Sequence, residues 1–298
     1  MADGDTGDLD KIMGELKLEK KIFKEGLAKP SELMHYCMLL DTLGDHEGML
    51  NCALVHVEKT CSGGGTLRPA DENLQRDMFA VACKKYMTSR LEMSRVLRDK
   101  KAHIEANTLG IRLQYINKYL QAFESELLEH IKNIITIIDQ RLIPCCSVEE
   151  NRVFYYKMLA DYFRYSVDFI EGTNDAREYM HAVSEALANY KYAMELGKAH
   201  LAPTSPIFLA MVLNYSVFIY DMQNNVVGAI DCAEKVFNEA IKSMHTLDVS
   251  EHKESTLLLQ LLRDNLQLWK HAAAVDSGDG DGGGGGLTQD DPEIEDED

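Results

Sequence analysis

The chain has few basic residues for its acidic ones: 31 Lys and Arg stand against 49 Asp and Glu, giving a formal net charge of −18 over 298 residues. Because a polyanion would be repelled at long range, we exclude nucleic acid and membrane surfaces as partners. The sequence also lacks a leading apolar run suited to a signal peptide, and it has no stretch of about eighteen apolar residues that could span a bilayer. We therefore expect a cytoplasmic protein.

Metal and catalytic motifs are missing as well. Seven cysteines and ten histidines are present, but they form no CxxC or HExxH spacing. We therefore predict reduced, mostly buried thiols rather than a disulfide framework or a zinc site, and no cofactor. The sequence also shows no nucleophile elbow, P-loop, paired-glutamate metal motif or Cys–His dyad, so an all-helical enzyme is the least favoured of three functional readings.

Prolines are scarce too, with only six in the chain, and the helix breakers cluster at a few points. Apolar residues recur at the three- and four-residue spacing of a helix face, while alternating β-branched runs are rare. This pattern predicts an all-α protein whose 45% hydrophobic content suffices for a sizeable core. A tetratricopeptide-like array is the second choice because no 34-residue self-similarity is sustained, although periodicity alone does not separate the two.

Helix breakers and capping signals divide the chain into segments. A capping box of Ser147 and Glu150 is expected to open one helix, and Pro144 is expected to stop the helix before it. The expected helices are 33–59 with a turn near Gly44, 71–103, 109–142, 147–170, 175–200, 207–222, 226–244 and 255–269.

Three regions are expected along the chain. Residues 1–30 form an amphipathic extension whose mixed-charge polar face favours packing on this chain or a partner over a membrane. Residues 31–272 form the helical domain. Residues 273–298 form a disordered, acidic, Gly-rich tail, and without its ten acidic residues the rest of the chain carries only about −8. A local basic pocket is therefore compatible with the composition. The tail could fold back over such a pocket or serve only solubility.

The last helical segment, STLLLQLLRDNLQLW at 255–269, combines an apolar face with an amide. Leu258, Leu261 and Trp269 lie on this face, and Asn265 lies within one turn of the last two. An amide offers both a donor and an acceptor to a peptide backbone, so this face could hold an extended peptide. Plain core packing is the alternative for the aliphatic residues.

A second informative segment is VFYYKMLADYFRY at 153–165. Lys157, Asp161, Arg164 and Asp168 follow at spacings of four, three and four, which places them along one helix face. They could simply form exposed ion pairs that contribute a few tenths of a kcal/mol each. However, Tyr165 adds a hydroxyl beside the Arg164 guanidinium, and this combination suits the oxygens of a phosphate, with Asp161 as the anchor of both.

These two segments, together with RDMFAVACKK at 76–85 and VLNYSVFIYD at 212–221, resemble the 14-3-3 family over roughly residues 33–272. The resemblance implies a nine-helix antiparallel array in which the first four helices dimerise and the others form a concave groove. It also implies a dimeric, non-catalytic adaptor that binds phosphoserine- or phosphothreonine-containing segments of partner proteins.

Carried over position by position, the resemblance implies three groups of site residues. The phosphate-binding residues are Lys84, Arg95, Arg164 and Tyr165. The residues that support the groove or bind the peptide backbone are Lys157, Asp161, Asn214, Asp221 and Asn265. The apolar side of the groove comprises Leu213, Val217, Leu258, Leu261, Leu268 and Trp269.

The chain departs from the family pattern at the phosphate site. Where the family has the first of two arginines four residues apart, this chain has Leu91, and the second is Arg95. The neighbouring Arg90 is turned about 100° away from the stripe of Lys84 and Arg95. Because a charge-assisted hydrogen bond contributes about 1.5–3 kcal/mol, phosphate affinity is expected to fall by roughly one to two powers of ten. A phosphorylation-independent scaffold is therefore the alternative function.

The predicted dimer surface departs as well. At the two positions of one interfacial ion pair the chain has Asp45 and Glu126, and at the other pair it has Gly48 and Ala122. Acid then faces acid across a two-fold axis, which is repulsive although salt screens it. An apolar contact remains through Leu39, Leu43 and Tyr119. We expect a heterodimer with a related subunit in preference to a homodimer, bound to phosphorylated or acidic protein segments.

Overall fold

The computed structural model describes residues 29–61, 67–106, 110–170, 175–243 and 249–276. Every regular element in these ranges is helical, so the predicted all-α class is confirmed. The elements are α2 (Pro30–Thr42), α3 (His46–Cys61), α4 (Pro69–Ala106), α5 (Gly110–Ile137), η1 (Ile138–Leu142), α6 (Ile143–Cys145), α7 (Glu149–Ile170), α8 (Ala176–His200), α9 (Pro206–Asp221), α10 (Val226–Ser243) and α11 (Val249–Asp276). The predicted extension and most of the predicted tail lie outside the described residues.

The segments α5, η1 and α6 follow one another without a gap, so the described residues form nine helical rods, as expected. Pro144 does not stop the fourth rod where the sequence predicted. The helix runs on to Cys145, so Pro144 lies within the last segment, α6. The π-helical turn η1 directly precedes it.

A tight turn separates α2 from α3 at the predicted position. Gly44 has a φ of +68°, a left-handed conformation that glycine adopts without strain. Immediately after it, the carboxylate of Asp45 accepts a hydrogen bond from the backbone N–H of Gly48 at 2.9 Å and so caps the start of α3. The expected single segment is therefore two helices packed against each other.

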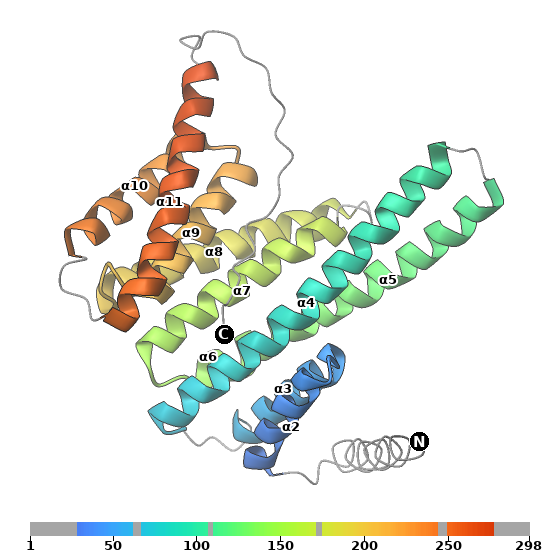
Figure 1. The fold of residues 1–298 in the computed structure, drawn as a ribbon, viewed down its shortest axis with the longest axis horizontal. Helices are drawn as coiled ribbons and strands as arrows, with labels where there is room; N and C mark the ends of the chain where they lie inside the picture. The colour runs from blue at the N-terminus through green and yellow to red at the C-terminus, as the bar shows by residue number, and fades with distance from the viewer. Residues whose placement is uncertain (1–28, 62–66, 107–109, 171–174, 244–248, 277–298) are drawn as a thin grey trace, which may run out of the picture.

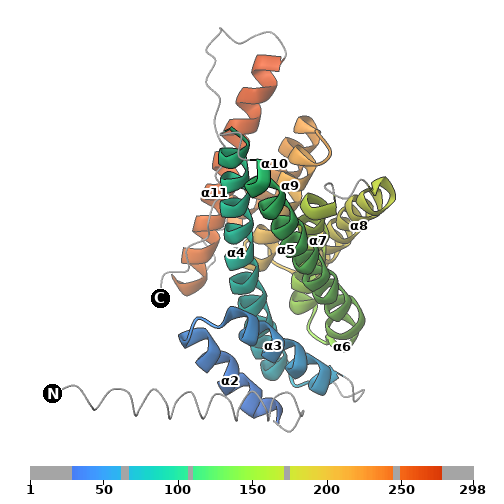
Figure 2. The ribbon, with the colours of Figure 1, turned by 90° about the vertical axis from the view of Figure 1, so that its right-hand side faces the viewer.

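The helices share two hydrophobic cores, and α7 belongs to both. The first core contains residues from every helix between α2 and α8, those two included. The second core contains residues of α7, α8, α9, α10 and α11. Figure 1 shows the long rods α4 and α5 side by side, with the α2–α3 pair at one end of the molecule, and Figure 2 shows the same order from the side. No helix in the described ranges is long and apolar enough to cross a membrane.

The start of α7 is capped by a carboxylate from another helix. Glu72 of α4 is 3% exposed and accepts hydrogen bonds from the backbone N–H groups of Ser147 and Val148, at 3.1 and 3.2 Å. The Ser147 hydroxyl, the Asn151 amide and the Cys146 thiol also donate to it, at 2.6, 3.0 and 2.9 Å. A negative charge at a helix N-terminus is further stabilised by the helix dipole.

The predicted capping box of Ser147 and Glu150 is therefore wrong. The Ser147 hydroxyl donates to Glu72 rather than accepting from the backbone of Glu150. The partner comes from α4, more than seventy residues earlier, and no local spacing in the sequence could indicate it. Burial raises the pKa of Glu72, but the hydrogen bonds from Cys146, Ser147 and Asn151 outweigh burial and leave the pKa below its usual value.

We expect Glu72→Gln to lower the free energy of unfolding by about 2 kcal/mol, because the amide loses the charge and part of the accepting capacity that α7 uses. Since the folded-state pKa is depressed, this contribution is complete above the unfolded pKa of about 4.3 and is lost as pH falls through the folded value. Urea unfolding at pH 7 and at acidic pH measures both effects. Glu129→Gln, at an exposed position of α5, is the matched control, and equal stability of the two variants would contradict the assignment.

Candidate functional site

Asp161 is the centre of the predicted site. Its side chain on α7 is 5% exposed and accepts hydrogen bonds from three other side chains. The Lys157 ammonium lies 2.8 Å from Oδ2, and the Asn214 amide lies 3.0 and 3.1 Å from the two carboxylate oxygens. The buried phenol of Tyr190 donates to Oδ1. The charge of Asp161 is thus paired and hydrogen-bonded, as a buried carboxylate requires.

This network joins three helices. Lys157 lies one turn before Asp161 on α7, whereas Tyr190 belongs to α8 and Asn214 to α9. Burial, followed by the negative charge of Asp161, raises the pKa of Tyr190 well above its ordinary value, so the phenol stays protonated and donates. The Asn214 amide is therefore held in one orientation beside the ammonium of Lys157.

Arg164 and Tyr165 follow on the next turn of α7. The Arg164 guanidinium lies over the Tyr165 ring, 4.7 Å from its centroid, and the Tyr165 ring meets Tyr162 edge-on at 5.6 Å. Both residues are half-buried. Stacking on an aromatic ring limits the rotation of the guanidinium, so the directions of its N–H donors are restricted.

The residues that the sequence assigned to the α4 side lie on that helix at different depths. Lys84 and Arg95 are exposed, whereas Leu91 is half-buried against the first core. Arg90 is occupied elsewhere: its guanidinium pairs with Glu47 of α3 at 2.6 Å and stacks on two aromatic rings of the core. The Arg90 guanidinium is therefore bound to α3 and to the core rings.

The predicted apolar side of the groove is mostly inside the second core. Leu213, Leu258 and Trp269 are buried, and Val217 and Leu261 are partly buried. Trp269, only 2% exposed, stacks on Tyr220 with ring centroids 5.3 Å apart. These side chains pack in the second core beneath the surface of α9 and α11.

The remaining residues of this side reach the surface. Leu268 is 52% exposed and Asp221 is exposed, while the amides Asn214 and Asn265 are half-buried. Both amides lie on helices whose opposite faces fill the second core. Leu268 is thus the exposed apolar member of the predicted set, while Val217 and Leu261 are half-buried like the two amides.

Most of the chain is similar to known proteins. The family model described as 14-3-3 protein matches residues 57–270. Among curated relatives, 14-3-3 protein 9 of Solanum lycopersicum is 38% identical over 234 residues, covering 78% of this chain and 83% of the relative. The checkpoint signal transducer rad24 of Schizosaccharomyces pombe is 38% identical over 197 residues, covering 65% and 71%. Protein BMH2 of Saccharomyces cerevisiae is 38% identical over 196 residues, covering 65% and 70%.

The chain belongs to the 14-3-3 family. Proteins of this family are non-catalytic adaptors that bind partner proteins, which agrees with the expectation that this chain is not an enzyme. The match leaves out residues 1–56 and therefore α2 and the first part of α3. The segment that carries Leu39, Leu43 and Asp45 therefore lies outside the part of this 14-3-3 protein that the family model matches.

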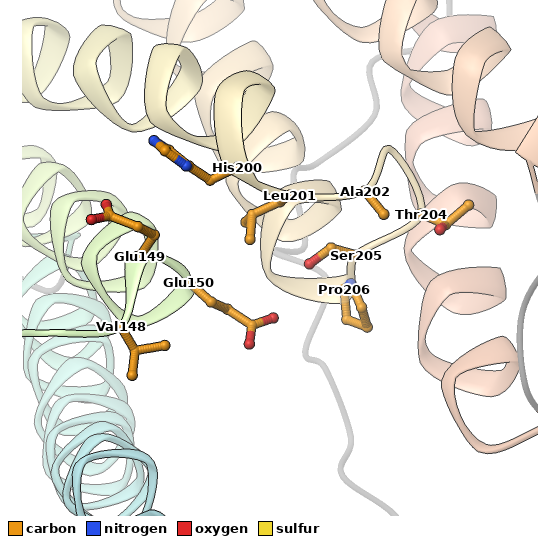
Figure 3. Close-up of a pocket in the computed structure, with 9 residues that line it drawn as sticks. All are labelled: Val148, Glu149, Glu150, His200, Leu201, Ala202, Thr204, Ser205 and Pro206. Carbon is orange, nitrogen blue, oxygen red and sulfur yellow. The ribbon is translucent and has the colours of Figure 1, made fainter. Parts of the chain in front are cut away.

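A separate cavity of about 470 Å³ lies away from the predicted 14-3-3 site, where the start of α7 meets the connection from α8 to α9 (Figure 3). It shares no residue with the predicted site. Its lining residues are Val148, Glu149, Glu150, His200, Leu201, Ala202, Thr204, Ser205 and Pro206. No group of three or more metal-ligating side chains occurs in the part of the chain that the structure describes.

Sequence reasoning missed Tyr190. Its position in α8 carries no motif, and its role depends on α8 packing against α7, so only the tertiary structure shows the bond to Asp161. The sequence did indicate Asp161 as an anchor, but for Arg164 and Tyr165. The structure shows its hydrogen bonds to Lys157, Asn214 and Tyr190.

We expect Tyr190→Phe to lower the free energy of unfolding by about 1–2 kcal/mol, because the buried carboxylate of Asp161 loses a donor that water cannot replace. Tyr115→Phe, at a phenol that is 74% exposed on α5, provides the control and should change stability little. Thermal and urea unfolding measure the difference. Identical stabilities would mean that the Tyr190 hydroxyl contributes nothing to holding the network.

Proposed function

We propose that this 14-3-3 protein binds phosphoserine- or phosphothreonine-containing segments of partner proteins along α4, α7, α9 and α11. The observation that carries the proposal is the buried Asp161 carboxylate, which fixes a cation from α7 and an amide from α9 next to each other. A phosphate needs the cations, and an extended peptide backbone needs the amide.

The phosphate itself would be bound by Arg164 and Tyr165, with Lys84 and Arg95 contributed from α4. A guanidinium stacked on a phenol ring presents planar donors, and this geometry suits two oxygens of a phosphate. Asn214 and Asn265 would hydrogen-bond the ligand backbone whatever its sequence. These roles rest on the 14-3-3 pattern and on the positions of the side chains.

The phosphate pocket is proposed to be weaker than the family pattern implies. Leu91 supplies no donor and packs on the core, while Arg90 is held by Glu47 and two aromatic rings. Moving Arg90 to the phosphate would break that ion pair and both stacking contacts. The chain therefore has one guanidinium fewer for the phosphate.

We expect a fluorescein-labelled phosphoserine peptide to bind more tightly than its unphosphorylated form, and Leu91→Arg to tighten the phosphorylated form by a further ten- to hundredfold. Fluorescence polarisation at fixed ionic strength measures both. Val227→Arg, which adds the same charge at an exposed position of α10, is the matched control for general electrostatic attraction. Arg164→Ala should remove most of the preference for phosphate.

The alternative is a scaffold that binds partners without phosphate. This alternative predicts that the natural chain binds the phosphorylated and unphosphorylated peptides with equal affinity. Only the Leu91→Arg variant would then prefer the phosphorylated peptide. Equal gains from Leu91→Arg and Val227→Arg would instead show that net charge alone causes the effect, and would remove the argument for a weakened pocket.

A second proposal concerns assembly: 14-3-3 proteins form dimers, and we propose that this chain prefers a related subunit to a second copy. Apolar side chains are exposed at the end of α2 and on α5, where dimerisation was expected. Leu39 of α2 is 40% exposed, Leu43 directly after α2 is 47% exposed, and Tyr119 of α5 is 59% exposed. Glu126 is exposed on the same helix as Tyr119. Asp45 is held at the start of α3 by its cap, so its negative charge stays at this surface.

We expect Glu126→Arg to tighten the homodimer several-fold, because the new cation would face Asp45 of a second copy instead of a like charge. Glu195→Arg, exposed on α8, adds the same charge elsewhere and should leave self-association unchanged. Sedimentation over a concentration series measures the dissociation constants. A natural chain that already forms a homodimer at nanomolar concentration would refute the heterodimer preference.

We also propose a cytoplasmic location.

A further inference from the structure

Two cysteines from distant parts of the chain meet where α3 and α6 end. Cys61 is the last residue of α3 and Cys145 is the last residue of α6. The Cys145 thiol donates a hydrogen bond to the Cys61 carbonyl, with 3.5 Å between sulfur and oxygen. The two thiols also interact: burial first, and then the hydrogen bond with the Cys145 thiol, raise the pKa of Cys61 to about 12.

The two helix ends are held together by more than this contact. Arg141 of η1 lies 3.3 Å from Glu58 of α3, so an ion pair joins α3 to the same rod about one turn before each cysteine. Cys61 is buried, whereas Cys145 is partly exposed. A polar oxidant can therefore reach the Cys145 thiol, while the Cys61 thiol is shielded from solvent.

The other cysteines differ in this respect. Cys146 is buried and donates to Glu72 at 2.9 Å and to the Val148 carbonyl at 3.2 Å, so its thiol keeps its proton. Cys37 and Cys52 also interact with each other, but both are fully buried between α2 and α3. Cys61 and Cys145 thus combine mutual contact with access from solvent.

We propose that Cys61 and Cys145 are a dithiol oxidation site at which a hydroperoxide produces an intramolecular disulfide between α3 and α6. In the first step the Cys145 thiol releases its proton, its thiolate attacks the hydroxyl oxygen of the peroxide and the O–O bond breaks. Cys145 becomes a sulfenic acid, and the other oxygen leaves as hydroxide or alkoxide, which takes up that proton to become water or an alcohol. In the second step the Cys61 sulfur attacks the Cys145 sulfur, the S–O bond breaks, and water leaves with the Cys61 proton. The peroxide gains the two electrons that the thiols lose.

The disulfide would close a long loop that contains α4 and α5. Closing such a loop restricts the unfolded chain and so stabilises the folded one. It would also tie the α2–α3 pair covalently to the end of the fourth rod, beside the start of α7. This site does not depend on peptide binding, and none of its residues belongs to the proposed phosphate site.

The test uses the full chain, reduced and then treated with hydrogen peroxide at a small molar excess. After the free thiols are blocked with an alkylating reagent under denaturing conditions, non-reducing peptide mass spectrometry identifies the linked residues. We expect a Cys61–Cys145 cross-linked peptide in the monomeric band, and a melting temperature raised by several degrees that returns to its starting value on reduction. The buried pair Cys37 and Cys52 is the internal control: both residues should stay reduced during the peroxide treatment and be found alkylated afterwards.

Cys145→Ser should abolish both the cross-link and the shift in melting temperature, whereas Cys146→Ser should retain both. If Cys145→Ser does not fold, Cys61→Ser serves the same purpose, and the peptide map of the natural chain stands without either variant. The proposal is overturned if Cys61 and Cys145 both remain alkylated, if Cys145 proceeds to sulfinic acid without a cross-link, or if the linked pair is Cys37–Cys52 or includes Cys146.

Discussion

The structure depends on the burial of α7 between two hydrophobic cores. A helix covered on most of its circumference cannot leave charged side chains unpaired, because an isolated buried charge costs far more than packing returns. Asp161 meets this constraint by accepting from Lys157, Tyr190 and Asn214, and in doing so it joins α7, α8 and α9. The polar groups proposed to contact a ligand are positioned by the same bonds that make the burial possible.

The start of α7 follows the same pattern of satisfaction by a distant residue. The Glu72 carboxylate of α4 accepts from the backbone N–H groups of Ser147 and Val148, directly before the helix. This contact links the α4 side of the molecule to α7, although few other residues of the two helices meet and α5 packs against both. A proposed binding surface that includes α4, α7 and α9 therefore has a physical connection across its width.

The residues at which the sequence predicts a departure from the family pattern have contacts of their own in the fold. Leu91 packs on the first core, so an apolar side chain is stabilised where a cation would be free to face a phosphate. Arg90 completes an ion pair and two ring contacts of its own. Asp45 caps α3, which gives an acidic residue at the expected dimer surface a role within its own subunit. Each substitution thus has a stabilising contact in the fold.

The sequence by itself determined the helical class, the turn at Gly44, the family pattern and the four-residue spacing that pairs Lys157 with Asp161, because helix periodicity, positive φ at glycine and motif spacing are local properties. Only the tertiary structure decided which partners satisfy the buried groups. Glu72 replaced the expected capping box, Tyr190 joined Asp161, and Trp269 stacked on Tyr220. These outcomes depend on contacts between residues that are distant in the chain, and such contacts follow from helix packing rather than from spacing.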